Sequence, residues 1–178
     1  MADKPARDVN VNAVPQNLEA EQCLLGCILL DDNLAQELVP TLKAEDFYAP
    51  SHRILLSAMQ KVLNESKPID FVTVADALDR SGQLAAAGGI NYLTTLNTVV
   101  PSSANYRVYL KIVERNSVLR ALIRAGTSII EECRNSDDEE RSVAFAEKAV
   151  YDISDKKQSG DLTPVSYTHL RAHETLSD

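Results

Sequence analysis

The stretch from residue 102 to residue 157 constrains the fold most, because its apolar residues repeat at helical spacing along two segments. The first segment runs without proline from Ser103 to about Arg134, and one row of it has members three or four positions apart: Ile112, Asn116, Leu119, Ile123, Gly126, Ile130 and Cys133. A second apolar row lies beside the first: Val118, Leu122, Ala125 and Ile129. Two adjacent rows predict a helix with a wide apolar face.

A break at residues 135–138 separates this helix from a second one. Ser136 and Glu139 have the spacing of a capping box, and four acidic residues in succession suit the positive end of the next helix. The second helix repeats apolar residues at three-four-three spacing: Val143, Ala146, Val150 and Ile153. The pattern predicts an antiparallel helical hairpin over residues 102–157.

The predicted hairpin cannot bury so wide an apolar face by itself, since each of its two helices covers only part of the other. The rest of the face must pack either on the chain's own core or on another protein. The periodicity alone leaves both possibilities open.

Residues 15–101 predict a compact bundle of about five short helices. Asn17 and Asp70 are placed as N-caps, and Gly82 stands where a helix end favours a left-handed residue. Gly26 lies inside an almost wholly apolar helix, which suggests close approach by a neighbouring helix. We therefore predict an all-α fold, a compact helical bundle followed by a projecting antiparallel hairpin. It is flanked by a disordered N-terminal arm (1–14) and the start of an interdomain linker (158–165).

Composition excludes several classes of protein. The net charge of −8 disfavours direct contact with nucleic acid and suits a basic protein partner. No apolar run is long enough to cross a membrane and no signal peptide is recognised, so we expect a cytoplasmic protein. Cys23, Cys27 and Cys133 are interpreted as buried apolar residues in a reducing compartment.

The sequence contains no recognisable motif of catalysis or cofactor binding. Gly88 and Gly89 lack the lysine that a phosphate-binding loop requires. His52 is expected to be structural, and His169 with His173 lacks a third metal ligand. We therefore expect no catalytic, cofactor-binding or metal site and no enzymatic activity in this chain.

A series of short motifs resembles the N-terminal domain of bacterial replicative DNA helicases of the DnaB family. They occur in the family's order: residues 15–22 with 25–29, Glu45–Tyr48 with His52–Ile54, Pro68–Asp70 with Thr73 and Leu78, Gly88–Gly89 with Tyr92–Leu93, Pro101–Ser102 with Asn105–Tyr106, and Ile112–Val113 with Arg120 and Ile123. The resemblance covers about residues 14–165.

The resemblance implies an oligomerisation domain, in which hairpins of neighbouring subunits pair as a trimer of dimers in a hexameric ring. It also implies docking of primase and a helicase loader, within a helicase that unwinds the chromosome at the replication fork. ATP and Mg²⁺ would belong only to a motor domain beyond the linker. The resemblance favours a partner interface over residues 112–153, for which we predict seven self-association residues: Leu119, Leu122, Ile123, Ile130, Val143, Val150 and Ile153.

The resemblance ends near Val165. Residues 166–178 lack the family's pattern, and we interpret them as an artefactual tail, the translation of a sequencing adapter after a truncated reading frame. The alternative hypothesis for the chain is a stand-alone all-helical regulator that binds a basic protein or nucleic acid as a monomer.

Overall fold

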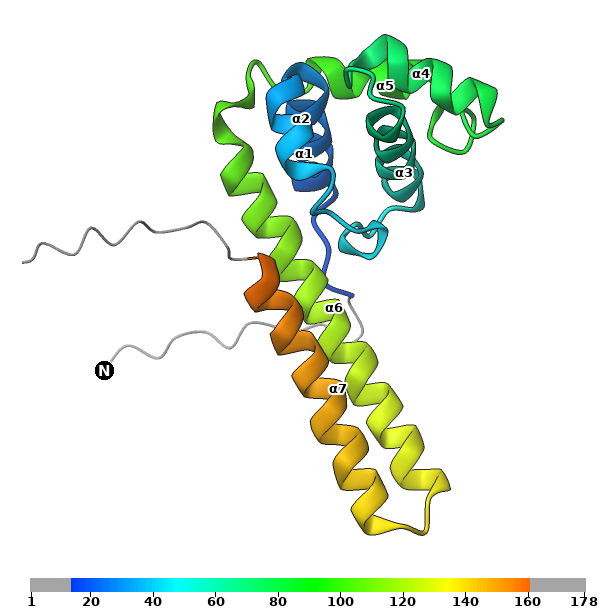
Figure 1. Cartoon of the computed structure of the whole chain (residues 1–178), viewed down its shortest axis with the longest axis vertical. Coiled ribbons are helices and arrows are strands. Elements are labelled where there is room, and N and C mark those ends of the chain that lie inside the picture. Colours follow the sequence, from blue (N-terminus) through cyan, green and yellow to red (C-terminus); the bar gives the residue numbers. More distant parts are fainter. Residues whose placement is uncertain (1–13, 161–178) are drawn as a thin grey trace, which may run out of the picture.

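A computed structural model describes residues 14–160, with side chains as far as residue 155. The described part is all-α and contains no strand. Its elements are α1 (Leu18–Leu30), α2 (Asp32–Leu38), the short 3-10 helix η1 (Ala44–Asp46), α3 (Pro50–Asn64), α4 (Phe71–Arg80), α5 (Gly89–Thr98), the 3-10 helix η2 (Ser103–Asn105), α6 (Tyr106–Asn135) and α7 (Glu139–Gly160). Helices α1 to α5 form a globule, from which α6 and α7 project as the predicted hairpin (Figure 1).

Helix α1 is the central helix of the globule and contacts α2, α3, α5 and α6. Between Ala20 and Leu29 only Gln22 escapes full burial, as the nearly continuous apolar sequence requires. A Cβ atom on Gly26 would lie 2.6 Å from the carbonyl oxygen of Leu96 in α5. The predicted close approach at Gly26 is therefore confirmed, and α5 is the neighbour.

Local capping follows the sequence closely in the globule. The side chains of Asn17 and Asp70 accept the backbone N–H groups of Ala20 and Thr73, so both predicted N-caps are confirmed. Gly82 has φ +66°, the left-handed conformation that ends α4.

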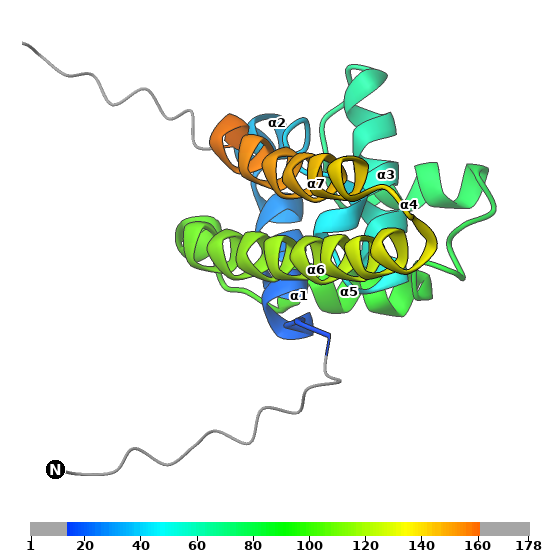
Figure 2. The same cartoon turned by 90° about the horizontal axis from the view of Figure 1, so that it is seen from below.

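Helix α6 is a single helix of 30 residues that belongs to both parts of the molecule. Its first turns pack on α1, and the rest extends away from the globule beside the antiparallel α7 (Figures 1 and 2). The predicted capping box is wrong in detail. Helix α7 begins one residue after Asp138, whose Oδ1 accepts the N–H of Arg141, and the Ser136 hydroxyl instead accepts the N–H of Asp138.

Helix α7 extends to Gly160, three residues past the predicted end of the hairpin. Most of the predicted arm (1–13), the remainder of the predicted linker (161–165), the predicted tail (166–178) and its two histidines lie outside the described residues. Among the described helices, none is both long and apolar enough to cross a membrane.

Candidate protein-interaction surface

Alanine and isoleucine side chains lie where the two hairpin helices pack together. Ala121, Ala125 and Ile129 of α6 are half-buried at helical spacing, and Ala146 and Ala149 are half-buried on α7. Ile153 continues the α7 row and is also half-buried. Of the seven residues predicted for self-association, Ile153 therefore lies on the side of α7 that packs on α6.

The other six predicted residues are exposed, and we call them the hairpin stripe: Leu119, Leu122, Ile123, Ile130, Val143 and Val150. Their exposed fractions run from 41% to 53%. At 3.6 residues per turn, the four members on α6 share one side of that helix. Val150 follows Ala149 by one position, and Val143 follows Ser142, which is half-buried and continues the same row of α7. In an antiparallel pair this places them on the same side of the hairpin as the α6 members.

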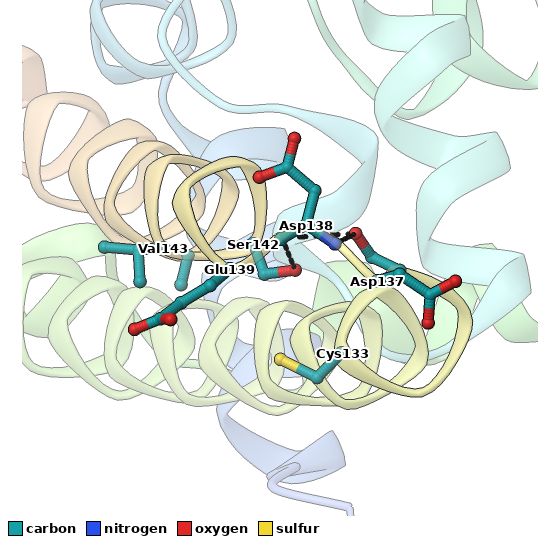
Figure 3. Close-up of a pocket in the computed structure, with 8 residues that line it drawn as sticks. Cys133, Asp137, Asp138, Glu139, Ser142 and Val143 are labelled. Atoms are coloured by element: carbon teal, nitrogen blue, oxygen red, sulfur yellow. Dashed lines mark hydrogen bonds between the residues drawn. The ribbon is translucent and has the colours of Figure 1, made fainter.

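A shallow groove near the hairpin end shows how the two helices meet on this side. Cys133 of α6 and Val143 of α7 both line it, together with Asp137, Asp138 and Glu139 (Figure 3). The prediction that all three cysteines are buried is wrong for Cys133, which is exposed, whereas Cys23 and Cys27 are buried. The physical reason is position: at the far end of the hairpin only α7 is close enough to cover α6.

Buried polar contacts fix the hairpin to the globule. The Arg120 side chain is only 4% exposed and donates hydrogen bonds to the carbonyl oxygens of Pro15, Glu45 and Asp46, at 2.9, 3.3 and 2.7 Å. One turn earlier, the Ser117 hydroxyl donates to Asp46 Oδ1 at 2.8 Å. A guanidinium group that satisfies three carbonyl groups sets the direction in which α6 leaves the globule.

A second buried polar cluster lies inside the globule. Glu21 Oε2 and His52 Nδ1 are 2.6 Å apart, His52 Nε2 lies 2.6 Å from the Tyr92 hydroxyl, and the two backbone N–H groups of Tyr48 and Ala49 donate to Glu21. Burial acts to raise the pKa of Glu21, but the hydrogen bonds from His52 and the backbone outweigh it and lower that pKa.

We interpret this cluster as structural, because its hydrogen bonds join α1, α3 and α5. The sequence indicated a structural His52 but gave no signal for its partners, which are 31 and 40 positions away. Among the residues that the structure describes, no group of three or more His, Cys, Asp or Glu side chains could hold a metal ion.

The fold and its surface define a helical domain with a projecting hairpin that exposes a stripe of apolar residues. The family described as "DnaB-like helicase N terminal domain" matches residues 13–115. The chain belongs to this family.

Two curated relatives extend the match through the hairpin. The chain is 40% identical to "Replicative DNA helicase DnaB" of Geobacillus stearothermophilus over 163 residues, 91% of this chain and 36% of that protein. It is 38% identical to "Replicative DNA helicase DnaC" of Bacillus subtilis, over 94% of this chain and 37% of that protein. The chain thus spans little more than a third of the length of these relatives.

Solved structures share the fold. The N-terminal domain of DnaB helicase from Mycobacterium tuberculosis is similar with a TM-score of 0.73 and 36% identity, over 79% of this chain and 99% of that one. A structure titled "The Structure Of A DnaB-Like Replicative Helicase And Its Interactions With Primase" is similar with a TM-score of 0.64 and 26% identity, over 79% of this chain and 31% of that one.

Proposed function

We propose that this domain joins copies of itself through the hairpin stripe and so builds the collar of a hexameric replicative DNA helicase. The observation that carries the proposal is the stripe itself. Six large apolar side chains lie exposed along one side of an extended hairpin, whereas most apolar residues of the globule pack in one core. Exposed apolar residues gathered on one side of an element are typical of a protein interface.

The family supports the same function. Its relatives are named replicative DNA helicases, and one solved relative is titled for its interactions with primase. We propose that the assembled hairpins present a docking surface for primase and a helicase loader, as a trimer of dimers in the bacterial cytoplasm. ATP-driven unwinding would reside in a motor domain of the longer helicase.

Light scattering coupled to size-exclusion chromatography, over a hundredfold range of concentration, tests self-association of the 178-residue chain. We expect a concentration-dependent dimer or larger species, which Ile123→Asp abolishes because it places a charge at the centre of the stripe. Val72→Asp is the matched control, since Val72 is 69% exposed on α4, outside the stripe. A monomer at every concentration would favour the alternative of a monomeric regulator.

Primase binding is tested by titrating primase from the same bacterium onto the wild type and the Ile123→Asp variant. Binding to the associated wild type and weaker binding to the variant would support a surface composed of several subunits. Equal binding to both would place primase on a single chain.

A further inference from the structure

We propose that three arginines at the base of the hairpin form a binding site for a short acidic segment of a partner protein. They are Arg53 of α3 and Arg120 and Arg124 of α6, and we call them the arginine cluster. The cluster lies where α6 leaves the globule, beside the loop that contains η1 (Figure 1). The site belongs to a single chain, so the inference goes beyond the proposed self-association and does not depend on it.

One loop holds the guanidinium groups of Arg53 and Arg120 in place. Arg120 donates hydrogen bonds to the carbonyl oxygens of residues 45 and 46, and Arg53 donates to those of residues 47 and 48, at 2.8 and 3.2 Å. Two arginines from different helices thus bind four successive carbonyl groups. Because these side chains are already ordered, an anion that binds them loses less conformational entropy on binding.

The positive charge of the cluster is not balanced by ion pairs. Carbonyl groups satisfy the donors but carry no net charge, and none of the three arginines forms an ion pair within residues 14–155. Burial lowers the pKa of Arg120. The charges of Arg124 and Arg53 also act to lower it, so the three arginines lie close enough to repel one another. The guanidinium group stays charged, because its ordinary pKa is very high.

The two carboxylates near Arg120 are already engaged by other groups. Glu21 and Asp46 both act to raise the pKa of Arg120, so both lie within reach of its charge. The buried Glu21 accepts hydrogen bonds from His52 and from two backbone N–H groups. Asp46 accepts from the Ser117 hydroxyl and from the backbone N–H of residue 43. The exposed arginines of the cluster therefore have no counter-charge of their own in the described part of the chain.

The cluster has an accessible side. Arg53 and Arg124 are exposed, whereas Arg120 is buried between them and the globule. Arg124 follows Arg120 by one helical turn, on the same side of α6. A planar guanidinium group binds a carboxylate through two parallel hydrogen bonds. Two exposed guanidinium groups beside a buried third suit two carboxylates that lie close together on one segment.

The surroundings favour a short acidic segment over the backbone of a nucleic acid. Glu45 is exposed in η1, and Glu131 is exposed seven residues beyond Arg124, on the same side of α6. A phosphate backbone that continued past the cluster would meet these acids, and its affinity depends on many phosphate contacts. The net charge of −8 predicts a basic partner for the surface as a whole, and the arginine cluster is a local exception.

Fluorescence anisotropy with a labelled hexaglutamate peptide tests the site in the full 178-residue chain, at a concentration where light scattering shows monomer. We expect binding that weakens as the salt concentration rises. Arg53→Gln with Arg124→Gln should raise the Kd about tenfold, because two exposed charge pairs are lost. Lys111→Gln with Arg115→Gln is the matched control. It removes the same charge from exposed positions on the other side of α6, and should change the Kd less than about twofold.

Arg124→Gln alone keeps the test valid if the double variant fails to fold, because Arg124 is exposed and forms no ion pair with a described residue. We expect it to raise the Kd about threefold. Equal losses in the two double variants would overturn the inference, since only net charge would then matter, and so would a wild type that does not bind the peptide. An oligothymidylate that binds more tightly than the peptide at the same arginines would also overturn it. None of these outcomes bears on self-association, which light scattering measures separately.

Discussion

Replacing Gly26 by Ala should destabilise the domain, although alanine is the better residue in a helix. The change lies in the middle of α1, where Gly→Ala alone favours the helix by about 1 kcal/mol. Here the new Cβ would lie 2.6 Å from the Leu96 carbonyl oxygen, 2.9 Å from Val99 Cγ1 and 3.3 Å from Val100 Cγ2. The nearest of these is a backbone atom of α5, so α1 and α5 must move apart.

The magnitude follows from these opposing effects. Overpacking of a core costs about 1–3 kcal/mol, and a contact with backbone belongs at the upper end of that range. After the helix-propensity gain is subtracted, we expect a net loss of about 1–2 kcal/mol in the free energy of unfolding. For a domain of this size that is a decrease in Tm of about 3–6 °C.

Gly126→Ala is the matched control, because Gly126 is also inside an α-helix but its Cβ would meet nothing within 4 Å. The same chemical change should therefore stabilise the monomer by about 1 kcal/mol. Urea unfolding measures both variants at a concentration where light scattering shows monomer, since association would add stability of its own. A Gly26→Ala variant as stable as the Gly126→Ala variant would refute the close approach of α5.

Three further predictions concern buried groups. Arg120→Met should lower the free energy of unfolding by about 3 kcal/mol, because three backbone carbonyl groups lose their donor. Exposed Arg124→Met is the control. Equal losses for the two variants in urea unfolding would contradict a stabilising role of the Arg120 hydrogen bonds. The pKa of Glu21 is lowered in the folded state, so its stabilising effect is complete above its ordinary pKa of about 4.3 and disappears as the pH falls through the lower value. Acid titration followed by circular dichroism should therefore show a steeper loss of structure in the wild type than in Glu21→Gln. Parallel curves would refute the stabilising effect of the ionised Glu21. Burial, with nearby Cys23, raises the pKa of the Cys27 thiol to about 11, so a thiol reagent at pH 8 should modify exposed Cys133 first and all three cysteines only after unfolding.

The sequence was most informative where periodicity and capping act locally. The two hairpin helices and the caps at Asn17 and Asp70 depend on residues within a few positions of each other, and the structure has them. Gly26 indicated a close approach through its place inside an apolar helix, but the neighbour, α5, lies about 70 positions away. Local patterns do not report which side of α7 packs on α6. For this reason Ile153 was grouped with the exposed residues although it is half-buried.

The contacts that the sequence did not reveal join distant segments. Arg120 reaches Pro15, which is 105 positions away, and His52 connects Glu21 to Tyr92. A charged residue on a helix ordinarily predicts a solvated surface, so a buried Arg120 becomes visible only when the packing of η1 against α6 is known. Cys133 is the opposite case, an apolar residue that is exposed. It continues an apolar row of α6 beyond the part of the helix that the rest of the fold covers.

Because α6 has no break where it leaves the globule, a movement at its base would be carried along the whole helix. Its 30 residues span about 45 Å, and only the first half is held by the globule. A rotation of a few degrees at the base would displace the far end by about 2 Å. A partner that binds the globule and rotates the base of α6 would thereby also move the far end of the hairpin, without any change in how that end is folded.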